Sequence, residues 1–236
     1  MTNYLTGRML GGTGTLLGPS PNTQFNSVIE LVVQALPVFA TFAMKEDVHN
    51  ENGLNSLLSL FISKVAKKNN LPFIAHHQSM EDTTRGNSAT PDIGIHLDID
   101  DEAEPPPRIT VFEGKRLTSS LSKKRRREYV VGHEEKGRYI PCGGIERFKL
   151  SIHARKLGHA GMVGYIQDRT PDHWRDQINS WISELSGQQP DPTWFDQERL
   201  TLPTTNGQVS ECSSVVYRKT GELNLTHLWI NLERKE

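Results

Sequence analysis

Apolar positions first recur with helical spacing, over two segments near the start of the chain. The first segment covers 25–44 and has a wide apolar face, with Pro37 expected to kink or divide it. The second covers 51–68, where Asn50 can act as the N-cap. Its apolar stripe consists of Leu54, Leu57, Leu58, Phe61, Ile62 and Val65. Both segments are predicted to be helices packed on a core.

Short runs rich in β-branched and aromatic residues follow, bounded by proline, glycine or charge. They predict strands at 72–78, 91–97 and 108–114. A helix is expected over 144–157, with Gly158 suited to its C-cap, and then a buried strand over 160–167. The expected fold class is α/β, with a central mixed sheet flanked by helices.

The remainder of the chain predicts one more helix and a hairpin. The helix opens near Thr170-Pro171-Asp172, and residues 186–206 are expected to form a loop. Two alternating segments around Thr220-Gly221 predict a C-terminal β-hairpin. Residues 1–45 are expected to be a flexible arm and a helix packed on a single domain at 46–236, whose α-β-β-β-α-β core spans 51–167.

Polar side chains lie at the ends of two of the predicted strands. Asp92 opens one strand, while Glu113 and Lys115 close the next on either side of Gly114. Because strand side chains alternate, Glu113 and Lys115 share a face, and Asp92 joins them if the strands pair. Carboxylates suit Mg²⁺, and Gly114 leaves its carbonyl free to approach an ion. The alternative is a solvated ion pair between Glu113 and Lys115, which contributes little stability.

The order Pro91-Asp92, a loop, and then Glu113-Gly114-Lys115 resembles the signature of the PD-(D/E)XK nuclease superfamily, which has a restriction-endonuclease-like fold. The resemblance implies that Asp92, Glu113 and the Gly114 carbonyl bind Mg²⁺, for which Mn²⁺ can substitute. It also implies that Lys115 assists the attacking water. Glu51 is either a further acidic ligand or a favourable charge at a helix start.

Basic residues are concentrated after Lys115, although the chain is close to neutral. Its net charge is −1 and its pI is near 6.8, which argues against a protein that coats nucleic acid non-specifically. We expect the basic residues to contact phosphates, with a merely solvated surface as the alternative. They are Arg116, Lys123, Lys124, Arg125, Arg126 and Arg127, with Arg147 and Lys149 on the helix predicted at 144–157.

Other candidate chemistry is weaker. The glycine cluster at 11–14 lacks a preceding strand and a following Gly-Lys-Ser/Thr, and the acidic run at 98–104 lacks calcium-loop spacing. His76 and His77 are adjacent in a strand and point to opposite faces. Gln167, at the end of the strand predicted at 160–167, can face the site of Asp92 and Glu113. Three further histidines are expected at structural or surface positions. These are His133, His153 and His159.

The cysteine content and the N-terminal sequence indicate in which cellular compartment the protein is expected. Cys142 and Cys212 cannot form a zinc site by themselves and are expected to be free thiols. The start of the chain does not have the pattern of a secretory signal, and no apolar run is expected to reach the roughly 20 residues that span a bilayer. A cytoplasmic protein without membrane contact is expected.

The leading hypothesis is a Mg²⁺-dependent endonuclease acting on DNA, with RNA also open, in restriction or phage defence. A homodimer and an activating partner subunit are both compatible with it. A catalytically inactive nucleic-acid- or protein-binding module on the same fold is the main alternative. An unrelated α/β enzyme acting on a small phosphorylated substrate is a third, although the chain lacks a nucleotide-binding loop.

Overall fold

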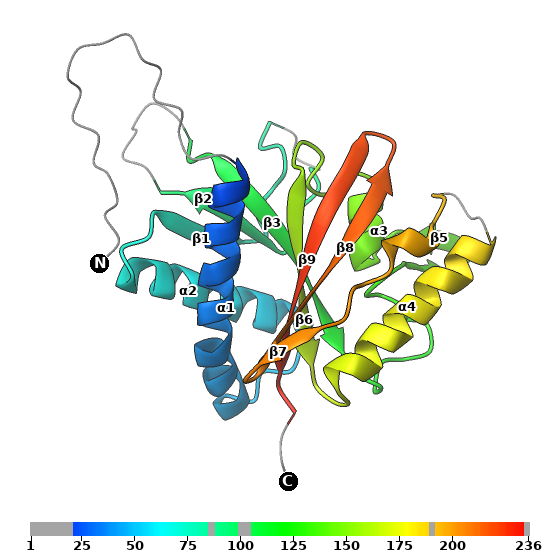
Figure 1. Ribbon diagram of the computed structural model, residues 1–236, viewed down its shortest axis with the longest axis horizontal. Helices are drawn as coiled ribbons and strands as arrows, with labels where there is room; N and C mark the ends of the chain where they lie inside the picture. The colour runs from blue at the N-terminus through cyan, green and yellow to red at the C-terminus, as the bar shows by residue number, and fades with distance from the viewer. Residues whose placement is uncertain (1–20, 85–87, 99–104, 189–191, 234–236) are drawn as a thin grey trace.

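A seven-stranded mixed sheet forms the centre of the protein, and helices cover both of its faces (Figure 1). The computed structural model describes residues 21–84, 88–98, 105–188 and 192–233. Its helices are α1 (Pro21–Lys45), α2 (Glu51–Lys68), α3 (Gly144–Lys149) and α4 (Pro171–Gln188), with a short 3₁₀ helix at Asp196–Glu198. Its strands are β1 (Phe73–His77), β2 (Ile93–Leu97), β3 (Arg108–Leu117), β4 (His133–Glu135), β5 (Arg138–Ile140), β6 (His159–Ile166), β7 (Thr204–Asn206), β8 (Val209–Arg218) and β9 (Gly221–Asn231).

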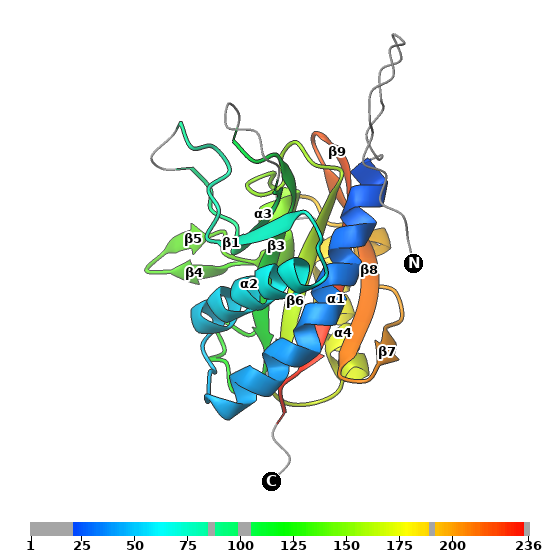
Figure 2. The same ribbon diagram turned by 90° about the vertical axis from the view of Figure 1, so that its left-hand side faces the viewer.

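The strand order in the main sheet is β1-β2-β3-β6-β9-β8-β7. β1, β2 and β3 are antiparallel neighbours, β3, β6 and β9 run parallel, and β8 and β7 are again antiparallel. The expected mixed sheet flanked by helices is confirmed at this level. The small hairpin β4–β5 projects away from the main sheet (Figure 2).

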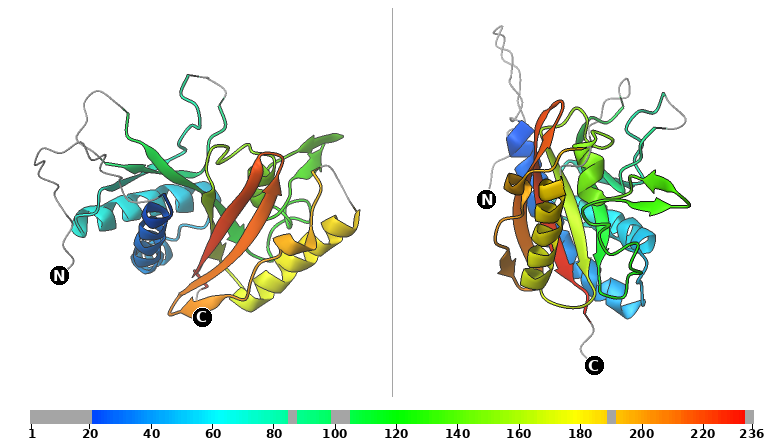
Figure 3. Two further views of the ribbon diagram at one scale, coloured as in Figure 1. Left: turned by 45° about the horizontal axis from the view of Figure 1, so that its top comes forward. Right: turned by 90° about the vertical axis from the view of Figure 1, so that its right-hand side faces the viewer.

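Two hydrophobic clusters fill the space on the two faces of the sheet. One joins α1 and α2 to side chains of β2, β3, β6 and β9, including Phe112 and Tyr165. The other joins α3 and α4 to the opposite face, including Val111 and Trp229, and α4 lies along the β8–β9 hairpin (Figure 3). Because side chains alternate along β3, Glu113 and Lys115 belong to the face that α3 covers.

The helix α1 corrects two expectations. Pro37 lies within it on an exposed turn, and the helix is not divided there. The helix is also long and apolar enough to cross a membrane by length and composition, which the sequence pattern did not lead us to expect. Half of the residues in its apolar stretch are buried inside the protein, as in the core helix of a globular domain. Residues 1–20, which contain the glycine cluster and the expected arm, lie outside the described residues.

The expected helix over 144–157 is wrong in length. α3 ends at Lys149, and the chain then turns through Ser151 and Ala154, which have φ angles of 54° and 55°. These left-handed conformations cannot continue a right-handed helix. The turn changes the chain direction and brings His153 back toward β3.

The expected loop at 186–206 and the C-terminal hairpin also differ from the structure. The loop contains the 3₁₀ helix and β7, while the hairpin β8–β9 forms as predicted but inserts into the sheet. β9 lies between β6 and β8, so the hairpin belongs to the central sheet, and β7 pairs with β8 only over 209–211. Most of the acidic run, at 99–104, lies outside the described residues.

Candidate functional site

Asp92, Glu113, Lys115 and Glu51 are brought together where β3 extends beyond β2. Asp92 precedes β2 by one residue, and its Oδ2 accepts a hydrogen bond of 2.9 Å from the Gly114 N–H. Lys115 Nζ lies 3.1 Å from Glu113 Oε1 and 2.8 Å from Glu51 Oε1. Thus the residues that the signature singled out form one connected cluster at the end of two neighbouring strands.

Asn55 explains why residue 114 is a glycine. A Cβ atom at this position would lie 1.9 Å from Asn55 Oδ1, an oxygen that also accepts a 2.7 Å hydrogen bond from the Tyr165 hydroxyl. Glu51 and Asn55 are four residues apart and therefore lie on the same face of α2. The close contact between Asn55 and Gly114 holds this face against β3 and so positions Glu51 beside Lys115.

Glu113 is the most heavily paired carboxylate in this cluster. Its side chain is 0% exposed, and Oε1 lies 2.5 Å from Arg147 Nη1 as well as close to Lys115. Oε2 lies 3.3 Å from His153 Nε2 but accepts no hydrogen bond from the described residues. Burial alone would raise the pKa of Glu113, but Lys115, His153 and Arg147 outweigh it and lower the pKa to about 2. Glu113 is therefore ionised at neutral pH.

Lys115 is held in its charged form. Burial opposes the charge, but the carboxylates of Glu113, Glu51 and Asp92 outweigh burial and raise the pKa of Lys115. A lysine with a raised pKa is a poor general base at neutral pH. It is instead a fixed positive charge and a hydrogen-bond donor at the centre of three carboxylates.

Asp92 shows the opposite behaviour to Glu113. Burial and the negative charge of Glu113 raise the pKa of Asp92 to about 6, although Lys115 and the Gly114 N–H act against the shift. The carboxylate has lost hydration without gaining a cation of its own. Strongly shifted carboxylates of this kind are concentrated at functional sites.

Asp92 and Glu113 offer carboxylate oxygens, the ligand type that hard divalent cations prefer. Within the described residues, Glu113 Oε2 accepts no hydrogen bond, and the Asp92 carboxylate accepts one only through Oδ2. The Gly114 N–H donates to Asp92. Because the N–H and C=O of one strand residue point to the same side of the strand, the Gly114 carbonyl is also directed toward the side of Asp92. Mg²⁺ typically takes one or two protein carboxylates and keeps several waters, which matches this set.

The predicted phosphate-binding residues after Lys115 fall into three groups. Arg116 alternates with Lys115 along β3 and lies on the other face, where it lines a pocket with His49 from the α1–α2 loop. Several of the others form ion pairs, whereas Lys123 and Arg126 are exposed and have no ion pair within the described part of the chain. The ion pairs are Lys124 with Glu135, Arg125 with Glu128 and Arg127 with Glu184.

Arg147 and Lys149, both on α3, lie in different environments. Arg147 is 27% exposed and contacts Glu113 in the cluster, so it can reach a substrate bound there. Lys149 is 1% exposed and forms a buried pair with Glu198 at 2.5 Å. The structure therefore gives no support for the predicted phosphate contact of Lys149.

His153 and Asn55 were missed as site residues. Asn55 interrupts the apolar stripe of α2 and is buried, and a polar residue at a core-facing helical position was the available signal. The position of His153 depends on the tight turn after α3, for which the sequence carried no clear signal. Gln167, which was expected to face the site, instead donates to the His49 carbonyl at 2.9 Å.

Comparisons of the chain with protein-family models, with curated proteins and with solved structures find no match. The residues of the cluster and their geometry are therefore the basis for assigning a function. Two carboxylates from neighbouring strands, beside a charged lysine, are the observations to be explained.

Proposed function

We propose that the protein is a metal-dependent nuclease that hydrolyses phosphodiester bonds in DNA. The observation that carries the proposal is the convergence of Asp92 and Glu113 beside Lys115, with the pKa of Asp92 raised to about 6. Its setting supports it, because α2, β1, β2, β3, α3 and β6 follow the order expected of a restriction-endonuclease-like core, with the β4–β5 hairpin inserted before α3. Restriction or phage defence is the biological role that the resemblance favours.

In this proposal Asp92, Glu113 and the Gly114 carbonyl hold Mg²⁺. When bound, the ion lowers the pKa of a water and stabilises charge on the phosphate. Lys115 remains protonated and donates a hydrogen bond to the attacking water or the phosphate, where it balances developing negative charge. Glu51 keeps Lys115 in place through the 2.8 Å contact between Oε1 and Nζ.

Arg147 has a separate role in the proposal. It is the more exposed partner of Glu113, at 27% against 7% for Lys115. A phosphate group arriving at the cluster offers the guanidinium a second anionic partner, and Arg suits bidentate contact with phosphate. Exchange of Arg147 from Glu113 to the substrate would leave Lys115 as the remaining cation on Glu113 Oε1.

The experiment is cleavage of plasmid and single-stranded DNA with Mg²⁺, Mn²⁺ or a chelator, comparing the wild-type protein with Asp92→Asn. The amide preserves an acceptor for the Gly114 N–H but removes the charge, so we expect cleavage to fall at least about 100-fold, as on loss of an electrostatic contact to the transition state. Asp98→Asn, at the exposed far end of β2, is the control and should cleave normally. Equal cleavage by Asp92→Asn and wild type would refute the assignment.

Glu113→Ala is a less informative variant for this purpose. Removal of a carboxylate that pairs with Lys115 and Arg147 leaves positive charges without their partner at a buried position. Breaking a buried ion pair typically costs about 3–5 kcal/mol. A loss of activity in that variant would therefore combine a chemical effect with unfolding.

One observation favours a second candidate, a non-catalytic nucleic-acid-binding module. Arg147 and Lys115 already contact the same oxygen of Glu113 and neutralise its charge without a metal ion. Such a module would bind DNA with a steep salt dependence and without any effect of chelator. Calorimetric titration with Mg²⁺ separates the two, because only the nuclease requires an ion at Asp92 and Glu113.

A further inference from the structure

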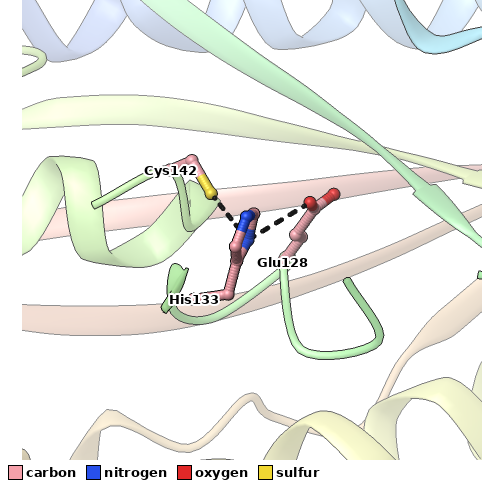
Figure 4. Close-up of side chains that lie close together, drawn as sticks. All are labelled: Glu128, His133 and Cys142. Atoms are coloured by element: carbon pink, nitrogen blue, oxygen red, sulfur yellow. Dashed lines mark hydrogen bonds and ion pairs between the residues drawn. The ribbon is translucent and has the colours of Figure 1, made fainter. Parts of the chain in front are cut away.

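A second cluster of side chains lies in the segment between β3 and α3. Glu128, His133 and Cys142 each place one potential ligand atom close to those of the other two, and the His133 ring lies between Cys142 and Glu128 (Figure 4). His133 Nδ1 lies 3.3 Å from Cys142 Sγ and 3.7 Å from Glu128 Oε1, and all three ligand atoms lie within 4.8 Å of one another. Neither predicted function uses these residues.

The spacing of the three atoms suits a tetrahedral ion. With Zn–S bonds of about 2.3 Å and Zn–N or Zn–O bonds of about 2.0–2.2 Å, neighbouring ligand atoms lie about 3.3–3.6 Å apart. The observed 3.3 and 3.7 Å separations are close to these values. The ligand atoms of Glu128 and Cys142 lie within 4.8 Å of each other, so an ion requires them to approach by at most about 1 Å.

The backbone around the three residues is fixed by close contacts between the segment at 131–133 and the segment at 140–143. His133 pairs with Ile140 across the β4–β5 hairpin, and Cys142 N–H donates to the Ile140 carbonyl at 2.9 Å. A Cβ at Gly132 would lie 1.9 Å from the Ile140 carbonyl oxygen, and one at Gly143 would lie 2.3 Å from the backbone of Val131. Only glycine permits these approaches, so the site is preorganised before any ion binds.

Hydrogen bonds hold both the backbone and the side chain of Glu128. Its carbonyl accepts the Gly144 N–H at 2.8 Å, and its Oε1 accepts from Arg125 Nε at 2.6 Å. A hydrogen bond to a ligating carboxylate is the usual outer-shell arrangement around a protein metal ion. Arg125 therefore orients Glu128 and offsets part of its charge.

The chemistry of the donors selects the class of metal. A thiolate and an imidazole are soft or borderline ligands that favour zinc and similar transition ions over Mg²⁺. Burial and the Glu128 carboxylate raise the pKa of the Cys142 thiol, so an incoming ion must displace its proton. Three protein ligands with a fourth position left to water is an arrangement that zinc commonly adopts in proteins.

We propose that Glu128, His133 and Cys142 form a zinc site, with water as the fourth ligand. The ion joins the β4–β5 hairpin to the chain immediately before α3, the helix that carries Arg147. Zinc would therefore fix the start of α3 relative to the basic segment at 123–127. The site shares no residue with the cluster of Asp92 and Glu113, and the proposal does not depend on the proposed nuclease activity.

The test is zinc titration of the full chain after treatment with chelator, using a chromophoric competitor to measure affinity. We expect one zinc ion per chain, with Cys142→Ser and His133→Ala each weakening the affinity at least about 100-fold, since even outer-shell changes cost 10–100-fold. Cys212→Ser is the matched control, because Cys212 is a buried free thiol on β8 and is not one of the three potential ligands. It should bind zinc as tightly as wild type.

Two further readouts separate the proposal from misfolding and from the other candidate site. Co²⁺ in place of zinc should give a thiolate charge-transfer band in wild type and in Asp92→Asn, but not in Cys142→Ser. Zinc should raise the melting temperature of wild type, Asp92→Asn and Cys212→Ser but not of Cys142→Ser or His133→Ala, while all variants have the same circular dichroism without metal. Absence of zinc binding to wild type, or equal binding by Cys142→Ser, would overturn the proposal.

Discussion

The charge of Asp92 is predicted to destabilise the folded protein at neutral pH. Its folded pKa of about 6 lies above the ordinary value of 3.8, so between these pH values the folded protein retains a proton that the unfolded chain has lost. Stability therefore falls as pH rises from about 4 to about 6, and the full penalty is present at pH 7. Replacement by asparagine removes this penalty.

The magnitude follows from the shift. Two pKa units at about 1.36 kcal/mol each give about 3 kcal/mol, and residual solvent screening reduces this to about 1–3 kcal/mol. Asp92→Asn keeps the shape and an acceptor for the Gly114 N–H, so no compensating loss is expected. In a domain of this size, each kcal/mol corresponds to about 2–4 °C in melting temperature.

The assay is urea unfolding of wild type, Asp92→Asn and the exposed control Asp98→Asn, in the presence of chelator. We expect Asp92→Asn to exceed wild type by about 1–3 kcal/mol at pH 7.5 and by much less at pH 4.5, with Asp98→Asn within about 0.5 kcal/mol of wild type throughout. Added Mg²⁺ should then stabilise wild type but not Asp92→Asn. A less stable Asp92→Asn at pH 7.5, or a difference independent of pH, would refute this reasoning.

Three other predictions concern the site and the core. Gly114→Ala places a Cβ 1.9 Å from Asn55 Oδ1 and should lower the unfolding free energy by about 1–3 kcal/mol in chemical denaturation, whereas an unchanged midpoint would contradict the contact. Burial lowers the pKa of His227 to about 3, so stability should be lost as pH falls from 6.5 toward 3, by up to about 5 kcal/mol. His227→Gln should flatten that part of the profile, and an unchanged slope would disprove the cause. If Lys123 and Arg126 contact DNA phosphates, replacing both by alanine should reduce the slope of log K against log salt by about 2 in fluorescence binding assays, while the ion-paired arginines of the same segment should matter less.

Local patterning was sufficient for most of the helices and strands. The apolar stripe of α2, the Asn50 cap and the alternating segments of the hairpin all depend on neighbours within a few residues, and Asn50 does accept from the Gly53 N–H at 2.8 Å. Placing Asp92, Glu113 and Lys115 together required only strand alternation and the pairing of two consecutive strands. These relations are encoded within short stretches of sequence.

The parts that sequence could not supply depend on distant contacts. Lys149 resembled an exposed basic residue until Glu198, far along the chain, provided a buried partner. His153 reaches Glu113 only because α3 stops early and the chain turns through left-handed residues. The cluster at Cys142 was overlooked because only cysteines were counted, although a mixed ligand set needs a single thiol.

The central position of β9 has a consequence for how the protein emerges during synthesis. β6 and β8 both require β9 as a neighbour, and residues 221–231 are translated several seconds after β6 at the roughly 5–20 residues per second of a ribosome. Until then β6 presents an unpaired, strongly apolar edge, the kind of surface that recruits other chains. The sheet that supports Asp92 and Glu113 is thus completed late in translation, once β9 has been made.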